Sequence, residues 1–213
     1  AKAVTAADLG DIDAGVDLDA GDPSDSGSPD GGLPCFSDGG IICENLTPAC
    51  FPDPALRHFF ESDGGASTFA SLKSSNQVTL SIVNQSVTGN MPIQDLTGLQ
   101  CFTALESLYI QYQEVSDFAP LEGLLNLEYL YLNDNSISNL APIAAMQSVQ
   151  FVDLSNNDID DLSILYSFMG SADSMKLLNL NGNQLSDLAG IEALTDLTSL
   201  HLSRNPGVTN IGP

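Results

Sequence analysis

The segment LEYLYLNDNSI at residues 127–137 fits the template L-x-x-L-x-L-x-x-N-x-I/L, and VQFVDLSNNDI fits it again 22 residues later. Three further segments follow this template, the third with Gln in place of Asn: MKLLNLNGNQL (175–185), LTSLHLSRNPG (197–207) and LESLYIQYQEV (105–115). A fourth, QVTLSIVNQSV (77–87), fits less well, with Gln77 at the first apolar position and Gln85 at the Asn position. From residue 105 onward, successive starts are 22, 22, 26 and 22 residues apart. Repetition in phase at this period predicts a solenoid of similar coils.

The apolar residues of each repeat are predicted to point into a shared interior. In the repeat that starts at residue 127 they are Leu127, Leu130, Leu132, Ile137, Leu140, Ile143 and Met146. One coil cannot bury these side chains alone, so the coils before and after it must cover them. Each buried Leu or Ile contributes about 1.5–3 kcal/mol. Stability is therefore expected to come from stacking between repeats.

The Asn of the template lies where the chain leaves the strand and turns. It recurs as Asn135, Asn157, Asn183 and Asn205. We expect each amide to bond unpaired backbone groups of its own repeat and of the next one, which makes a ladder. Loss of one Asn should leave buried polar groups unpaired, at a cost of about 1–3 kcal/mol.

The period and the template together identify leucine-rich repeats. The second halves of the repeats carry apolar residues three apart, as expected for a short 3₁₀ turn: SDFAPLEGL (116–124), SNLAPIAAM (138–146) and SDLAGIEAL (186–194). This pattern resembles the 22-residue class of the internalin-like surface proteins of bacteria. The resemblance implies an α/β leucine-rich-repeat solenoid, right-handed and curved, with a parallel sheet on its concave side and 3₁₀ or short helices on its convex side.

The segment FPDPALRHFF at residues 51–60 resembles the helical cap that often precedes such arrays in secreted bacterial proteins. Asp53 followed by Pro54 predicts a helix start. A second short helix, capped by Ser67 or Thr68, is expected after a break at Gly64–Gly65. The predicted domains are a disordered acidic linker at 1–34, a disulfide-containing N-terminal cap at 35–76 and a repeat array at 77–213. The array holds about six repeats, the last one incomplete.

The charge excludes several classes of partner. The chain has 213 residues, with 28 acidic residues against 5 basic ones and a formal net charge of −23. Nucleic acid and anionic membrane surfaces are therefore repelled. No apolar run approaches the roughly 18 residues of a membrane-spanning helix, so no membrane insertion is expected.

The first 34 residues consist mainly of Asp, Gly, Ala, Ser and Pro, which favours a flexible spacer. Calcium binding is an alternative, because Asp11, Asp13, Asp17 and Asp19 recur at short spacing. The EF-hand pattern fails, since its sixth position is Val16 instead of Gly. The chain opens with neither Met nor a basic-then-apolar segment, so we expect that a signal peptide was removed or left out.

The four cysteines are Cys35, Cys43, Cys50 and Cys101, which three pairings can join. We favour Cys35–Cys43 with Cys50–Cys101, the second tying the cap to the array. Zinc is the competing interpretation, but the spacings lack a zinc knuckle. Disulfides, the acidic spacer and the family resemblance together indicate a secreted or cell-envelope protein.

Five aromatic residues are predicted on the concave face, with two acids beside them: Tyr109, Tyr112, Tyr129, Tyr131 and Phe151, with Asp134 and Asp153. Neighbouring strands lie about 4.8 Å apart, so the rings should form one contiguous patch. Clustered exposed aromatics are typical of protein-binding sites. The alternative is that these rings only pack against each other as good strand residues. Asp158 and Glu114 also border the patch, and this acidity favours a partner with a basic surface.

No catalytic motif and no cofactor motif occurs in the sequence, and His58 and His201 are expected to be surface or capping residues. We therefore expect no enzyme and no cofactor. The predicted function is that of an extracellular or cell-envelope module that binds a protein ligand on its concave face. The alternative is a passive structural domain of a larger protein whose activity, enzymatic or otherwise, lies outside these residues.

The last repeat runs through Val208, Ile211 and Pro213 and stops before its next apolar position. Solenoids need a terminal cap over the final apolar edge. We expect that the natural chain continues beyond Pro213 or that this edge joins another subunit.

Overall fold

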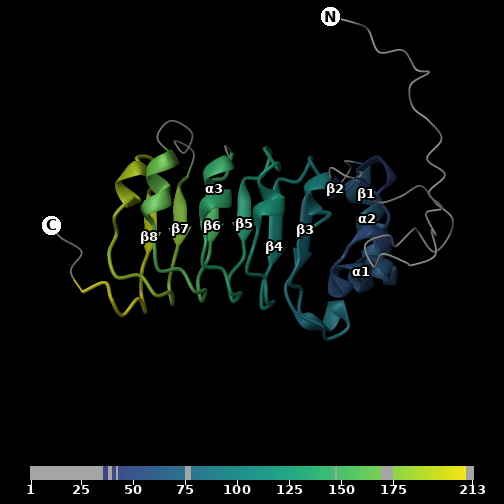
Figure 1. Ribbon diagram of the computed structural model, residues 1–213, viewed down its shortest axis with the longest axis horizontal. Helices are drawn as coiled ribbons and strands as arrows, with labels where there is room; N and C mark the ends of the chain where they lie inside the picture. Colours follow the sequence, from purple (N-terminus) through teal and green to yellow (C-terminus); the bar gives the residue numbers. More distant parts are fainter. Residues whose placement is uncertain are drawn as a thin grey trace, which may run out of the picture.

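The computed structural model describes residues 36–37, 40–41, 43–74, 78–146, 148–168 and 175–209, so the predicted linker at 1–34 lies outside it. A six-stranded parallel sheet forms one face of the array, with the strands side by side in chain order (Figure 1). The strands are β3 (Thr79–Ile82), β4 (Ser107–Ile110), β5 (Tyr129–Tyr131), β6 (Phe151–Asp153), β7 (Leu177–Asn179) and β8 (Ser199–His201).

The strands pair in the register that the sequence template predicts. Residues at template position 3 face one another across the whole sheet: Thr79, Ser107, Tyr129, Phe151, Leu177 and Ser199. The longer steps before residues 105 and 175 cause no slip, because the added residues lie outside the strands. The predicted leucine-rich-repeat solenoid is confirmed.

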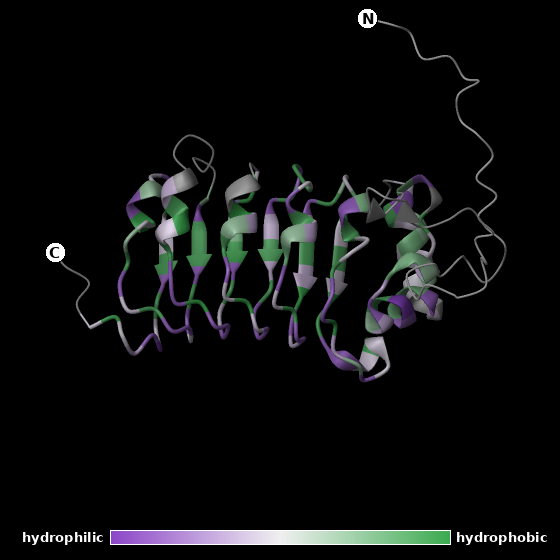
Figure 2. Ribbon diagram, viewed as in Figure 1, coloured by the Kyte–Doolittle hydropathy of each residue, from purple (hydrophilic) through white to green (hydrophobic). Residues whose placement is uncertain are grey.

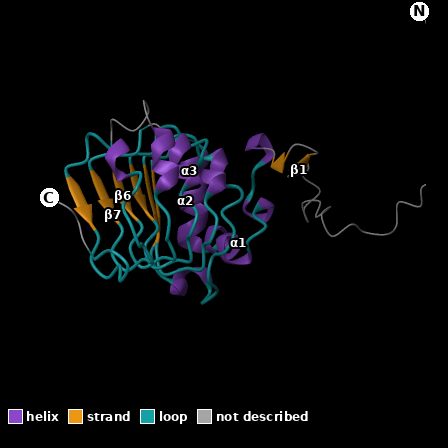
Figure 3. Cartoon of the chain, turned by 60° about the vertical axis from the view of Figure 1, so that its left-hand side comes forward, coloured by secondary structure: helices purple, strands orange, loops and turns teal. Residues whose placement is uncertain are grey.

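Short helical turns form the face opposite the sheet (Figure 3). They are η4 (Leu99–Cys101), η5 (Ala119–Leu121), α3 (Ala141–Ala145), η6 (Ser163–Phe168) and η7 (Ile191–Ala193). Most begin in the same way: a side-chain oxygen accepts the backbone N–H two residues later, as Asp117 does from Ala119 at 2.9 Å. Such local bonds favour turns over longer helices.

The interior between the two faces is apolar and continuous. The seven side chains predicted to point inward from the repeat at residue 127 are all at most 2% exposed. Hydrophilic residues recur instead in the turns where the strands end (Figure 2). Leu200 and Leu202 of the last described coil are only half-buried, since no described coil covers them. Ile211 and Pro213 lie outside the described residues.

The N-terminal cap lies at one end of the array (Figure 1). It contains the pair β1 (Phe36–Ser37) and β2 (Gly40–Ile41), the turns η1 (Cys43–Asn45) and η2 (Pro48–Cys50), and the helices α1 (Pro54–Glu61) and α2 (Asp63–Lys73). The turn η3 (Gln85–Thr88) follows β3. Phe51, Phe60 and Phe69 of the cap pack with Phe102 of the first full repeat, with ring centroids 4.8–6.3 Å apart. This cluster joins the two interiors.

The predicted start of α1 is confirmed, because Asp53 Oδ1 accepts from the N–H groups of Ala55 and Leu56. The predicted start of α2 is wrong: the cap is Ser62, whose Oγ accepts from Gly65 N, and Gly64–Gly65 lies inside the first turn. A Cβ on Gly65 would lie 1.6 Å from Phe59 O. This glycine therefore permits a close approach between the helices instead of separating them.

The disulfide pairing also differs from the prediction. Cys43 bonds to Cys101, with Cα atoms 5.1 Å apart. Cys35–Cys43 and Cys50–Cys101 are therefore both wrong, because each needs one of these two sulfurs. Cys50 is disulfide-bonded as well and is buried in the cap interior, whereas Cys35 lies outside the described residues. The bridge that ties the cap to the array thus comes from η1, which lies beside η4.

Among the described residues, no helix has the length and apolar character needed to cross a bilayer.

Candidate functional site

Two stacked aromatic pairs lie on the sheet face. The rings of Tyr109 and Tyr131 have centroids 4.8 Å apart with planes 14° from parallel, and those of Tyr129 and Phe151 are 4.9 Å apart and 2° from parallel. The parallel register explains both pairs, because equivalent residues of neighbouring strands stand about 4.8 Å apart. All four side chains are half-buried. We call these four residues the aromatic platform.

The fifth predicted aromatic residue is not part of the aromatic platform. Tyr112 lies beyond the end of β4 in the left-handed region, with a φ of 57°, and its side chain is 55% exposed. The strand pleat no longer applies at this position, so alternation could not predict its direction.

The residues equivalent to Tyr112 form a column of left-handed residues at the strand exits: Tyr112, Asp134, Asn156, Gly182 and Arg204. The N–H groups of the first four bond the next coil, as from Asn156 N to Asn181 O at 2.7 Å and from Gly182 N to Ser203 O at 2.8 Å. The sheet ladder thus continues past the strands and fixes the exit turns against one another.

Asp134 and Asp153 are held in place next to the aromatic platform. Asp134 accepts from Asn156 Nδ2 at 2.9 Å and from Asn133 Nδ2 at 2.6 Å. Asp153 accepts from Ser155 Oγ at 2.6 Å and from Asn179 Nδ2 at 3.1 Å. Among the described residues, neither carboxylate forms an ion pair. Their negative charge is therefore not compensated within the described chain.

Tyr131 stacks on Tyr109 and is paired with Asp153 on the neighbouring strand. Burial raises its pKa above the ordinary value, and the nearby Tyr109, Asp153 and Tyr129 raise it further. The phenol therefore stays protonated near neutral pH and can donate a hydrogen bond.

The Asn ladder forms, but each residue bonds its own coil and the preceding one instead of the next. Asn157 accepts from Ile137 N at 2.9 Å and donates to Leu132 O and Leu154 O, both at 3.1 Å. The equivalent bonds are made by Asn135, Asn183 and Asn205. Gln113 takes over part of this role, since its Oε1 accepts from Ile93 N at 2.9 Å.

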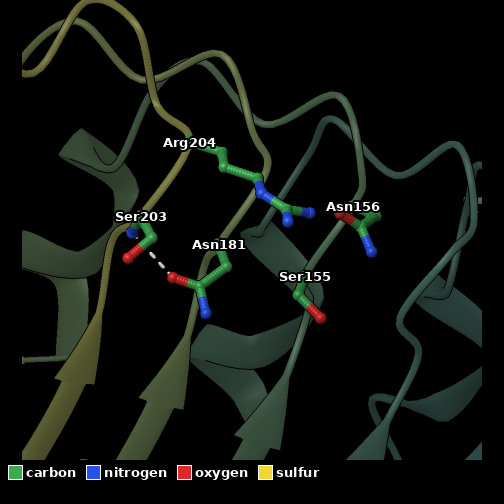
Figure 4. Close-up of a pocket in the computed structure, with 5 residues that line it drawn as sticks. All are labelled: Ser155, Asn156, Asn181, Ser203 and Arg204. Carbon is green, nitrogen blue, oxygen red and sulfur yellow. Dashed lines mark hydrogen bonds between the residues drawn. The ribbon is translucent and has the colours of Figure 1, made fainter.

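A polar pocket lies beside the left-handed column and was not expected from the sequence. Its volume is about 320 Å³, and its lining residues are Ser155, Asn156, Asn181, Ser203 and Arg204 (Figure 4). His201 is exposed, with Nε2 3.0 Å from Ser199 Oγ. Across the described segments, no group of three or more His, Cys, Asp or Glu residues is placed to hold a metal ion.

Comparisons with known proteins show which proteins the chain resembles. A family model described as Leucine Rich repeats (2 copies) matches residues 125–167 and 173–213. None of the curated proteins compared with the chain matches it in sequence. Among solved structures, the internalin InlF from Listeria monocytogenes has 26% identity and a TM-score of 0.51 over 63% of this chain and 44% of its own.

Two further structures from Listeria monocytogenes are similar. The functional domain of InlJ has 22% identity and a TM-score of 0.55 over 71% of this chain and 31% of its own. Internalin C2 has 23% identity and a TM-score of 0.46 over 76% of this chain and 91% of its own. The chain spans less than half of the InlF and InlJ chains. By its repeat template and its sheet the chain is a leucine-rich-repeat protein, and its fold is similar to that of the internalin InlF.

Proposed function

We propose that the chain is a secreted or cell-envelope interaction module that binds a protein ligand on the sheet face of its array. The internalin-like fold supports a role in protein–protein interaction, since such solenoids offer extended concave surfaces for binding. The observation that carries the proposal is the aromatic platform, in which two stacked pairs share one face beside two carboxylates that form no ion pair with a described residue. We propose no catalytic role for these residues.

Stacking supports binding because it leaves the platform ordered before a partner arrives. Tyr109 and Tyr131 each hold the other ring in place, and so do Tyr129 and Phe151. Side chains that are already immobilised lose little entropy on binding. Buried Tyr side chains at the centre of interfaces are frequent hot spots, each worth about 2 kcal/mol or more.

Charge supports a basic partner. Asp134 and Asp153 stand beside the platform, and the chain carries a formal net charge of −23. A field of this sign speeds the approach of a positively charged surface and repels a negative one. The partner is therefore proposed to present Lys or Arg opposite these two carboxylates.

We retain the domain assignment within this proposal. Residues 35–76 cap the array, residues 77–213 form it, and the acidic residues 1–34 act as a spacer that precedes the cap. The composition of the spacer supports this role, because like charges along a chain repel and extend it.

The test replaces Tyr109, Tyr129 and Tyr131 together by Ala and uses the chain as bait for cell-surface proteins, with capture measured by quantitative mass spectrometry. Tyr166→Ala is the matched control, because this tyrosine is exposed on the turn η6, away from the sheet. We expect the wild type and the control to capture the same proteins equally and the triple variant to lose them. The melting temperature of the triple variant should change little. Equal capture by all three would favour the passive structural domain.

A further inference from the structure

The polar pocket is built by three successive coils. Ser155 and Asn156 follow β6, Asn181 follows β7, and Ser203 and Arg204 follow β8 (Figure 4). The lining side chains are hydroxyls, amides and a guanidinium, without a carboxylate. The pocket therefore differs in chemistry from the acidic surface around it.

The pocket exists because the middle coil has glycine in the left-handed column. A Cβ on Gly182 would lie 2.3 Å from Asn156 Oδ1. Without a side chain at this position, Arg204 of the following coil extends across the turn toward Asn156 (Figure 4). Arg204 itself holds a φ of 60°, a conformation that costs energy for a residue other than glycine or asparagine.

The Arg204 guanidinium has no partner in the described chain. Three other basic side chains are described there, and all are engaged: Arg57 with Phe51 O, Lys73 with Leu46 O and Lys176 with Asp196. Arg204 forms no hydrogen bond or ion pair with any described residue, although the chain holds 28 acidic residues. A guanidinium that lines a pocket in such an acidic protein is available for an external anion.

Two further donor residues, Asn181 and Ser203, line the same pocket. Asn181 Oδ1 accepts from Ser203 N at 2.6 Å, and this bond orients the amide. Within the described residues, neither Asn181 Nδ2 nor Ser203 Oγ donates to another group. The pocket thus combines one charged fork with an amide donor and a hydroxyl donor, which matches an anion with several acceptor oxygens.

We propose that this pocket binds one carboxylate group of a ligand, with the Arg204 guanidinium, Asn181 Nδ2 and Ser203 Oγ as donors. A carboxylate fits better than a phosphate, because Asp134 and Asp153 bond directly to the lining residues Asn156 and Ser155. A dianion would meet more repulsion from these two carboxylates than a monoanion does. The planar carboxylate also matches the fork of the guanidinium.

The pocket also predicts how charged groups are arranged on the protein ligand. This step depends on the proposed function. The backbone of Arg204 lies two coils beyond that of Asp153 and three beyond that of Asp134, or about 10 and 15 Å at the usual strand spacing, and its side chain extends back toward Asn156 (Figure 4). A protein ligand is then expected to present an acidic group within about 15 Å of its basic ones. Such a pattern discriminates between partners better than a uniformly basic surface does.

The test is direct because the chain holds two arginines, Arg57 and Arg204. The ¹⁵N-labelled protein is titrated with sodium acetate against equal sodium chloride, and the Nε–H signals of both arginines are followed by NMR. We expect a saturating shift of the Arg204 signal with acetate, while Arg57 changes little because it is engaged with Phe51 O. No acetate-specific shift of Arg204 would overturn the site.

Substitutions and other probes complete the test. Arg204→Gln should weaken acetate binding about ten-fold or more, followed at the Gly182 amide, whereas Lys176→Gln, with the same charge change, should leave it unaltered. N-acetylglycine and N-acetylaspartate amide distinguish a chain-end from a side-chain carboxylate, and a shift with either supports the site. Phosphate binding as tight as acetate would overturn the carboxylate assignment. No arm depends on the unidentified partner, so this test and the tyrosine test fail independently.

Discussion

Asp53 Oδ2 accepts a hydrogen bond from the backbone N–H of Gln94 at 2.8 Å, across 41 residues of sequence. The same oxygen accepts from Asp95 N, while Oδ1 caps α1. One carboxylate, 4% exposed, thus fixes the cap helix and ties it to the first coil.

Asp53→Ala should therefore destabilise the protein by about 2–4 kcal/mol, since it removes a helix cap and leaves buried N–H groups unpaired. Urea unfolding followed by circular dichroism measures this loss. Asp95→Ala is the control, because Asp95 Oδ1 bonds only Thr97 N within its own turn. Equal losses in both variants would contradict the joining role of Asp53.

Asn157 shows what the ladder contributes. It is 7% exposed and bonds Ile137 N, Leu132 O and Leu154 O. Asn157→Ala should cost about 1–3 kcal/mol in the free energy of unfolding, because these groups stay buried without partners. Asn126→Ala is the matched change at an exposed Asn, which bonds only Thr103 O, and should stay within about 0.5 kcal/mol. Similar values for both would show that the ladder is not a source of stability.

Local periodicity was sufficient to predict the array and the position of the aromatic platform. Residues two apart on a strand share a face, and equivalent residues of parallel coils are neighbours, so Tyr109 and Tyr131 could be placed from the template alone. Tyr112 could not, because it follows the strand in a left-handed turn. The template also could not predict that each Asn of the ladder bonds the preceding coil and not the next one, because the template is the same in every coil.

The features that the sequence did not reveal depend on contacts between elements, which neither local propensity nor the repeat template specifies. Gly65 looks like a helix break in the sequence, yet it is needed because its backbone lies close to Phe59 O. The cysteine pairing depends on which cap turn meets η4. The polar pocket arises from a missing side chain at Gly182 between Asn156 and Arg204. A glycine at a turn position does not by itself predict that a pocket lies beside it.

The Cys43–Cys101 bridge predicts a specific peptide map. Digestion without reduction should release one peptide pair that joins these two cysteines, and a pair that joins Cys50 to Cys101 would contradict the bridge. The bond spans 58 residues, so in the chain-entropy model its loss costs about 4 kcal/mol. A Cys43→Ser, Cys101→Ser double variant should show this loss in urea unfolding.

Tyr131 predicts how stability changes at high pH. Its pKa in the folded state is raised, first by burial and then by Tyr109, Asp153 and Tyr129. The unfolded chain therefore ionises first as the pH rises. The contribution of Tyr131 to stability is complete below the ordinary pKa of about 10 and is lost as the pH rises through the folded-state pKa.

The free energy of unfolding should thus fall more steeply above about pH 10 in the wild type than in Tyr131→Phe, which cannot ionise there. Urea unfolding at a series of pH values provides the comparison, and the difference between the two proteins isolates this one group. Parallel curves through this range would contradict the role assigned to the Tyr131 environment.

A substitution at Gly182 is predicted to lower both the stability of the protein and the acetate response of the pocket. Gly182→Ala places a Cβ 2.3 Å from Asn156 Oδ1 in a backbone with a φ of +69°, so we expect a loss of about 1–3 kcal/mol. Gly123→Ala is the matched control: its Cβ would meet no atom within 4 Å, and it should be neutral or stabilising by up to about 1 kcal/mol. Because Asn156 must move to admit the methyl group, Gly182→Ala should also reduce the acetate response of Arg204, which Gly123→Ala should preserve. An unchanged acetate response in a folded Gly182→Ala protein would mean that the space beside Gly182 is not where the carboxylate binds.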